Sequence, residues 1–232
     1  MDEYHIYLIS GMGLDERLFF KMKIDSPNVH HINWIEPLPK EDIEDYARRM
    51  MQQIKHRGNI ILIGVSFGGM MAIELSKILR VEQVIIISSI KQKEELPFLL
   101  KIAQYFPVYH LTTPKMRQTF RSIWGRYFGL FSQEAFLFFD DMFEKSSATY
   151  KTWAVNRIAN WQNETYPKNL IHIHGTKDKI FPIKKIHDSI IIKGGTHGMI
   201  VNRAEEISQQ VNDILHHFVN SKIKKPSNST DN

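Results

Sequence analysis

The sequence predicts an α/β fold in which a parallel β-sheet is buried between helices. Short, almost uninterrupted apolar runs alternate with helical stretches along most of the 232 residues. The clearest run is residues 59–65 (NIILIGV), and residues 83–88 (QVIIIS) follow after one helical stretch. Such runs are typical of parallel strands that are covered on both faces. The chain is long enough for one such domain with a sizeable core.

The other elements follow in order along the chain. Residues 4–10 are expected to form the first strand, and residues 31–35 a weaker second strand that ends before two prolines. Residues 41–56 predict a helix because acidic residues occupy its first turn and basic residues its last, as the helix dipole favours. Further strands are expected at 170–174 and 189–192, a helix or turn at 15–23, and further helices at 67–80 and 204–219.

A long stretch in the middle of the chain interrupts this alternation. Residues 91–165 show no clear strand pattern, are divided by three prolines and hold 16 of the chain's 26 aromatic residues. We therefore expect a helical insertion at 91–165 within an α/β core formed by residues 1–90 and 166–220. The polar residues 221–232 are expected to form a disordered tail.

Composition and charge exclude several classes of function. The net charge is +5 and most basic residues are scattered, so we do not expect nucleic-acid binding, which needs a concentrated basic face. The chain has no cysteine, which excludes disulfides, thiol nucleophiles and cysteine-ligated metals. No apolar run approaches the roughly 18 residues of a membrane span. Residues 1–13 do not resemble a signal peptide, and we expect a cytoplasmic protein.

Residues 64–68 (GVSFG) carry the strongest chemical signal in the sequence. The bare Gly-x-Ser-x-Gly pattern occurs by chance in roughly one chain of this length in ten. Here it follows the best predicted strand and precedes a helix, which is the setting of a nucleophile elbow that exposes the serine hydroxyl above a sheet. A serine hydroxyl needs an adjacent base to react at neutral pH. The pattern predicts that Ser66 is a catalytic nucleophile.

Two later loops offer a base and an acid for Ser66. His197 lies in residues 194–198 (GGTHG), after the last predicted strand, where an imidazole can reach the strand ends. Asp178 follows the preceding strand and can orient His197 and stabilise its charged form. The order Ser66, Asp178, His197 is the order that accompanies such an elbow. The alternatives are an incidental histidine and a carboxylate that only caps its own turn.

An oxyanion hole requires two backbone N–H groups. Phe67, directly after the nucleophile, and Met12, in residues 10–13 (SGMG), are the candidates. A simple glycine turn is the alternative for that loop, which lacks the nucleotide-binding patterns. His172 and His174 alternate in a strand, but two histidines without a third ligand are more typical of packing than of a metal site. We expect neither a metal nor a cofactor.

With these segments placed, the chain resembles the α/β-hydrolase superfamily. SGMG, GVSFGG, HGTKDKIFP and GGTHG look like its oxyanion, elbow, acid and histidine loops, and the resemblance covers about residues 3–220. It implies a six-stranded parallel sheet in the order 2-1-3-4-5-6, because the first strand leads directly into the oxyanion loop. It also implies that residues 91–165 form a helical cap. Ser10 stands where many members have histidine, so the hydrogen bonding of the oxyanion loop is expected to differ.

The resemblance implies hydrolysis of a carboxylic ester or thioester through an acyl-enzyme, and small capped esterases such as the pimeloyl-carrier-protein methyl esterase group look most similar. The same triad also serves acyltransferases, peptidases, lyases and perhydrolases, and a non-catalytic binding protein of this fold is a further alternative. The expected partner is a small acyl substrate, free or carrier-linked. Candidates to line its pocket are Phe120, Trp124 and Phe128. A basic set that either meets an acidic carrier or forms a solvated helix face comprises Lys115, Arg117, Arg121 and Arg126.

Overall fold

A six-stranded parallel sheet forms the centre of the computed structural model, which describes residues 3–103, 105, 125, 127–130 and 132–223. Its order is β2-β1-β3-β4-β5-β6, as the sequence predicted, and every neighbouring pair is parallel. The strands are β1 (His5–Ile9), β2 (Val29–Ile32), β3 (Ile60–Val65), β4 (Gln83–Ile87), β5 (Leu170–Gly175) and β6 (Ile190–Ile192).

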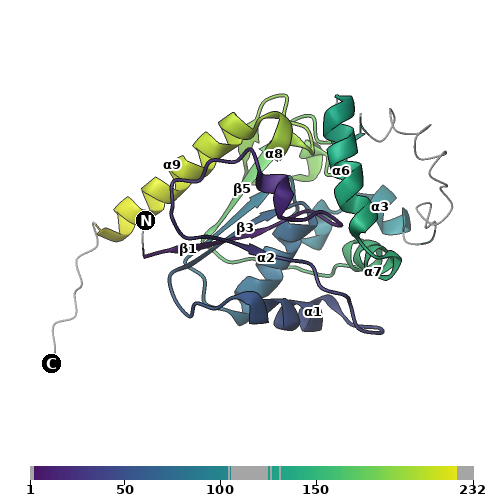
Figure 1. Cartoon of the computed structure of the whole chain (residues 1–232), viewed down its shortest axis with the longest axis horizontal. Helices are drawn as coiled ribbons and strands as arrows, with labels where there is room; N and C mark the ends of the chain where they lie inside the picture. Colours follow the sequence, from purple (N-terminus) through teal and green to yellow (C-terminus); the bar gives the residue numbers. More distant parts are fainter. Residues whose placement is uncertain (1–2, 104, 106–124, 126, 131, 224–232) are drawn as a thin grey trace.

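Helices cover both faces of this sheet (Figure 1). One face packs against α1 (Ile43–Met50) and α2 (Phe67–Ile78), and the other against α8 (Met199–Asn202) and α9 (Ala204–Ile223). Three helices lie toward the carboxyl ends of the strands: α3 (Phe98–Ala103), α6 (Gln133–Lys145) and α7 (Ala148–Ala159). Short 3₁₀ helices complete the described elements: η1 (Glu16–Phe19), η2 (Met51–Gln53), η3 (Lys93–Glu95) and η4 (Ile183–Lys185).

The burial of the central strands explains why their sequence pattern is so clear. All residues of β3 and β4 are buried, because helices cover both of their faces. A fully buried aliphatic side chain contributes about 1.5–3 kcal/mol. The isoleucine-rich runs therefore place the most stable part of the core directly beneath the loops that follow β3 and β4.

The second strand differs from the prediction of residues 31–35. β2 spans Val29–Ile32 and pairs with β1 from Ile6 to Ile9. The chain then leaves the sheet because its next peptide groups find partners elsewhere. The Gln53 side chain binds both the N–H and the carbonyl of Asn33, and the Tyr46 hydroxyl does the same for Ile35.

Two helix ends also differ from the predicted ranges. α1 ends at Met50 and only the single 3₁₀ turn η2 extends it, short of residue 56. α9 continues to Ile223, three residues into the stretch expected to be a tail, where Lys222 forms an ion pair with Glu82 at 2.6 Å. Residues 224–232 lie outside the described part of the chain, as do residues 106–124 of the predicted insertion.

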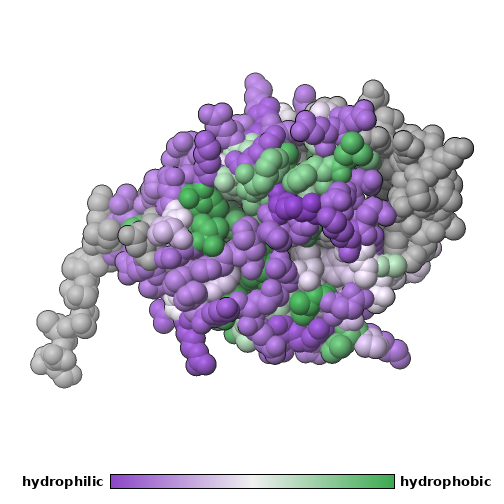
Figure 2. All heavy atoms as spheres, in the orientation of Figure 1, coloured by the Kyte–Doolittle hydropathy of each residue, from purple (hydrophilic) through white to green (hydrophobic). Residues whose placement is uncertain are grey.

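Apolar side chains on the face seen in Figure 2 form small separate patches among hydrophilic ones. Isolated exposed apolar residues are normal on globular proteins. In the part of the chain that the structure describes, none of the helices has the length and hydropathy needed to cross a bilayer.

Candidate active site

Ser66 lies in the turn between β3 and α2, in a backbone conformation that side chains rarely adopt. Its φ is 55° and its ψ is −121°, a conformation that costs on the order of 1–3 kcal/mol. Two hydrogen bonds hold the turn: the Ser66 N–H donates to the Ile87 carbonyl at 2.9 Å, and the Ser89 hydroxyl donates to the Ser66 carbonyl at 2.7 Å. This is the strand–turn–helix arrangement expected of an elbow.

The glycines of the elbow allow α2 to approach the sheet closely. A Cβ on Gly64 would lie 2.2 Å from the Gly68 carbonyl oxygen, and a Cβ on Gly68 would lie 2.3 Å from that of Ile9. Both obstacles are backbone atoms, which cannot rotate away as a side chain can. The two glycines thus set how tightly the helix that follows Ser66 packs on β1 and β3.

Gly68→Ala is therefore expected to lower the free energy of unfolding by about 2–3 kcal/mol, since the new methyl group overpacks the junction. Urea denaturation followed by circular dichroism measures this change. The matched control is Gly58→Ala, because a Cβ at Gly58 meets no atom within 4 Å and should change stability by less than about 0.5 kcal/mol. Equal stability of the two variants would contradict the packing described for the elbow.

His197 and Asp178 reach Ser66 from the loops after β6 and β5. The Nε2 atom of His197 lies 2.9 Å from the Ser66 Oγ, and its Nδ1 lies 2.8 Å from the Asp178 Oδ2. The other carboxylate oxygen of Asp178 accepts the N–H groups of Ile180 and Phe181 at 2.8 and 2.9 Å. The three predicted residues thus form one hydrogen-bonded chain. Asp178 and His197 are buried, and Ser66 at its end is partly exposed.

The charge state of Asp178 determines which groups donate and which accept in this series of hydrogen bonds. Burial raises the pKa of Asp178, but His197 with its hydrogen bond, His174 and the Phe181 N–H together outweigh burial, so this pKa lies below its usual value. Asp178 is therefore ionised at neutral pH and accepts the Nδ1–H of His197. This hydrogen-bond pattern assigns the tautomer in which Nε2 carries a lone pair toward the Ser66 hydroxyl. The imidazole is oriented to accept the serine proton.

The strand histidines pack behind this site, as expected, and bind each other. The His174 Nε2 lies 2.8 Å from the Phe181 carbonyl oxygen, and the His172 Nε2 lies 3.1 Å from the His174 Nδ1. Burial, reinforced by His174, lowers the pKa of His172 well below its usual value. Burial also lowers the pKa of His174, although Asp178 opposes this shift. Both imidazoles are neutral groups that support the loop of Asp178.

Mild acid should destabilise the protein because His172 stays neutral in the fold. An unfolded histidine takes up a proton below pH about 6.5, whereas folded His172 does so only at lower pH. The stabilisation is complete above pH 6.5 and is lost as pH falls toward the folded pKa, by up to about 1.4 kcal/mol per pH unit. Urea denaturation between pH 7.5 and 5 should show a shallower loss for His172→Gln.

The control for this pH dependence is His217→Gln, which changes an exposed residue of α9 and should keep the slope of the wild type. If His172→Gln lost stability as steeply as the wild type below pH 6.5, the account of His172 would be wrong.

The predicted oxyanion loop runs beside Ser66. A Cβ on Gly11 would lie 3.6 Å from the Ser66 Cβ, and Met12 follows directly. Phe67 is the first residue of α2, so its N–H belongs to the first turn, where amides have no partner within the helix. Both predicted amides therefore belong to segments next to the Ser66 hydroxyl.

Trp34 holds this loop, and the sequence reasoning missed it. Its Nε1–H lies within hydrogen-bond distance of the Ser10 Oγ at 3.1 Å and the Gly11 carbonyl at 3.0 Å, while the Ser10 hydroxyl donates to the Leu14 carbonyl at 2.6 Å. The indole also stacks on the Phe67 ring with 5.1 Å between centroids. Ser10 thus makes its own local contacts where many family members have histidine. No motif marks Trp34, because its role depends on where the chain leaves β2.

Of the predicted pocket residues, Phe128 lies beside the triad. Its ring meets the His197 ring edge-on with 5.6 Å between centroids, and its carbonyl accepts the Gly198 N–H at 2.7 Å. Phe181, which the sequence analysis did not name, contacts His197 in the same way at 5.5 Å. The other predicted pocket and basic residues lie outside the described part of the chain: Phe120, Trp124, Lys115, Arg117, Arg121 and Arg126.

Comparisons with known proteins agree with this architecture. The sequence model described as "Alpha/beta hydrolase family" matches residues 4–210. Among curated proteins, none matches the chain.

Solved structures are similar over almost the whole chain. A thermophilic esterase from Thermogutta terrifontis shares 14% identity and a TM-score of 0.68, over 94% of this chain and 91% of that one. A bromoperoxidase from Bacillus anthracis shares 17% and 0.66, over 93% of each chain. The enol-lactonase from Burkholderia xenovorans shares 16% and 0.66, over 93% of this chain and 92% of that one. At these identities the likeness shows a shared fold.

Proposed function

This chain belongs to the alpha/beta hydrolase family, and on that premise we propose that it is a serine hydrolase that cleaves a carboxylic ester or thioester. The family match supports hydrolase activity in general. The observation that carries the finer proposal is the hydrogen-bonded chain from Ser66 through His197 to Asp178. A binding protein has no need of a strained, partly exposed serine in contact with an oriented base.

In the proposed reaction, the Ser66 Oγ attacks the acyl carbon while the His197 Nε2 takes its proton. Asp178 stabilises the imidazolium that forms. The amides of Met12 and Phe67 stabilise the negative charge on the acyl oxygen. The C–O or C–S bond then breaks, and the leaving group receives the proton from His197. Water, deprotonated by the same imidazole, hydrolyses the acyl-enzyme and restores Ser66.

The side chains beside His197 suggest where the substrate lies. The ring of Phe128 is partly exposed and lies edge-on to the imidazole that contacts Ser66, so the acyl group is expected to meet this ring, whereas Phe181 is buried behind His197. We propose a small acyl substrate, free or carrier-linked; the further predicted pocket residues Phe120 and Trp124 lie outside the described part of the chain.

The test is a series of p-nitrophenyl esters and acyl thioesters of increasing chain length. We expect steady hydrolysis preceded by a burst of about one equivalent of p-nitrophenol, since an activated ester acylates Ser66 faster than water deacylates it. The burst should be absent in Ser66→Ala. A burst that is followed by turnover only when an alcohol or amine is added would favour an acyltransferase. Neither a burst nor turnover with any substrate would favour the non-catalytic alternative.

Trp34→Phe should lower kcat for p-nitrophenyl acetate about tenfold. The phenyl ring retains stacking on Phe67 but loses the N–H that holds Ser10 and Gly11, and a loosened oxyanion loop stabilises the transition state less. Steady-state kinetics should show a larger effect on kcat than on KM.

The matched control is Trp161→Phe, which removes a buried indole hydrogen bond to Glu74 at 2.7 Å and leaves the bonds of Trp34 to Ser10 and Gly11 in place. This variant should lose stability and keep kcat within about twofold. A Trp34→Phe enzyme with wild-type kcat would show that the Trp34 N–H does not position the oxyanion loop for catalysis.

A further inference from the structure

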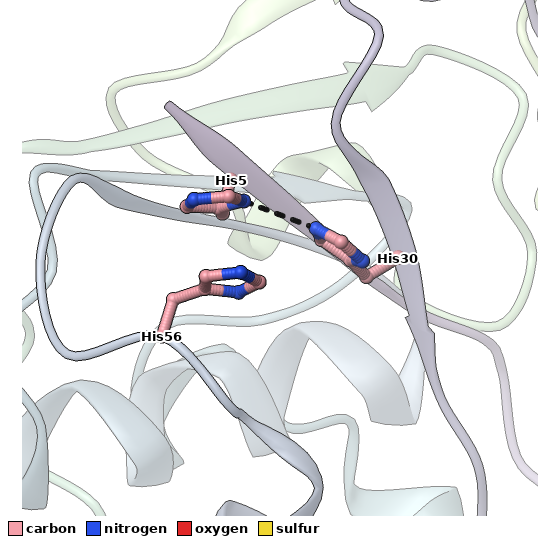
Figure 3. A group of neighbouring side chains, drawn as sticks. All are labelled: His5, His30 and His56. Carbon is pink, nitrogen blue, oxygen red and sulfur yellow. Dashed lines mark hydrogen bonds between the residues drawn. The ribbon is translucent and has the colours of Figure 1, made fainter. Parts of the chain in front are cut away.

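Three histidines converge near the amino ends of β1 and β3 (Figure 3), whereas Ser66 follows the carboxyl end of β3. His5 begins β1, His30 lies on β2, and His56 lies in the loop between η2 and β3. The register pairs Tyr7 with His30, so His5, two residues before Tyr7, lies on the same face of the sheet as His30. The parallel arrangement of β1, β2 and β3 brings together residues that are far apart in the sequence.

The spacing of these imidazoles suits a metal ion. One ring nitrogen from each of the three residues lies within 4.8 Å of the others, and the His5 Nδ1 is 3.2 Å from the His30 Nε2. At a Zn–N distance of about 2.0–2.1 Å, two ligands of a tetrahedral site are about 3.4 Å apart. All three side chains are half-buried, so an ion can reach them from solvent.

The ring of His56 adjusts on binding. Its plane is stacked on that of His5, with 3.3 Å between centroids and 10° between planes. A ligand nitrogen directs its lone pair within the ring plane, so one of these rings must rotate out of the stack to bind the same ion. His56 lies in a loop, whereas the backbones of His5 and His30 are fixed on paired strands, so we expect a movement of His56 that separates the stacked rings and keeps its contact with Tyr7.

Tyr7 supplies the partner that a ligating histidine needs on its second nitrogen. The Tyr7 hydroxyl is 2.7 Å from the His56 Nδ1 and accepts the Lys55 N–H at 3.2 Å. With Nδ1 as donor to Tyr7, the Nε2 of His56 carries the lone pair for a metal.

We propose that His5, His30 and His56 form a binding site for a divalent transition metal, Zn²⁺, with water as the fourth ligand. Three imidazoles suit Zn²⁺ and its neighbours Ni²⁺ and Cu²⁺, whereas Mg²⁺ and Ca²⁺ prefer oxygen ligands. The ion joins β1, β2 and the loop before β3. It therefore has a structural role, which is to stabilise the amino end of the sheet, and is not part of the triad.

The location separates this proposal from the proposed hydrolysis. His5 begins β1 and the oxyanion loop follows the end of that strand, so the two sites are on the order of 15 Å apart. Removal of metal by EDTA should leave hydrolysis of p-nitrophenyl acetate within about twofold. Zinc binding and serine hydrolysis can therefore fail or succeed independently.

The experiment uses the full chain without a polyhistidine tag, stripped with EDTA and then titrated with ZnCl₂ at pH 7.5 by calorimetry. We expect one tight equivalent and, at a hundredfold excess over Kd, a rise in Tm of about 5 °C or more. Co²⁺ in place of Zn²⁺ should give the intense visible absorption of a four-coordinate ion. His30→Gln should lose the tight equivalent, and Tyr7→Phe should weaken it about 10- to 100-fold.

The matched control is His31→Gln, which changes the exposed neighbour of His30 on the same strand and should bind Zn²⁺ like the wild type. If His30→Gln does not fold, His56→Gln, which changes a loop residue, tests the same loss of tight Zn²⁺ binding. The proposal is overturned if the wild type takes up no tight Zn²⁺, or if His30→Gln and His56→Gln bind it as tightly as the wild type.

Discussion

Ser66→Ala is expected to lower kcat for ester hydrolysis by about 10⁶-fold. The substitution removes the only atom that forms the acyl-enzyme in the proposed mechanism, and the members of such a triad act as a unit. The residual rate of Ser66→Ala comes from the modest catalysis by the oxyanion donors. Steady-state and burst kinetics with p-nitrophenyl acetate measure the loss.

The fold should survive this substitution, because alanine only removes the hydroxyl at the strained position. The control is Ser76→Ala, the same chemical change on α2, where the hydroxyl bonds the Ile73 carbonyl of its own helix at 2.7 Å. Ser76→Ala should keep wild-type kcat. More than about one per cent of wild-type kcat in purified Ser66→Ala would place the nucleophile elsewhere.

Asp178→Asn is expected to lower kcat by about 10⁴-fold with little change in shape. One carboxylate oxygen of Asp178 already accepts the N–H groups of Ile180 and Phe181. The asparagine oxygen takes that place, so its NH₂ group faces the Nδ1 of His197. The imidazole then accepts at Nδ1 and carries its proton on Nε2, which leaves no lone pair to receive the proton of Ser66.

Kinetics with p-nitrophenyl acetate and circular dichroism together test Asp178→Asn. The matched change is Asp188→Asn, at an exposed turn residue with φ of 45°, a conformation that asparagine accepts readily. This control should keep kcat within about twofold. A loss of less than tenfold in Asp178→Asn would mean that the carboxylate does not set the tautomer of His197.

The convergence of Ser66, Asp178 and His197 was predictable because each of them lies in a short segment with its own local signal. The elbow of Ser66 and the loops of Asp178 and His197 directly follow apolar strands, and the carboxyl ends of parallel strands meet at one edge. The structure brings these three residues into one hydrogen-bonded chain. The order of the strands followed from the same loops through the family resemblance.

Features that depend on pairing between distant segments were not predictable. β2 ends early because Gln53 and Tyr46 bind the peptide groups that follow it, and neither residue belongs to a strand pattern. Trp34 reaches the oxyanion loop only because of that early end.

The cluster of His5, His30 and His56 is created by the register of β1, β2 and β3. Its members are separated by tens of residues, so no spacing along the chain marks them.

The most direct test of the central claim is labelling with a fluorophosphonate, followed by mass spectrometry of the digested protein. The reagent forms a stable bond with a serine that an adjacent base activates. We predict a single adduct on Ser66, absent from Ser66→Ala and strongly slowed in Asp178→Asn. Labelling of Ser66→Ala at the wild-type rate, or an adduct on another residue, would contradict the assignment of Ser66 as the nucleophile.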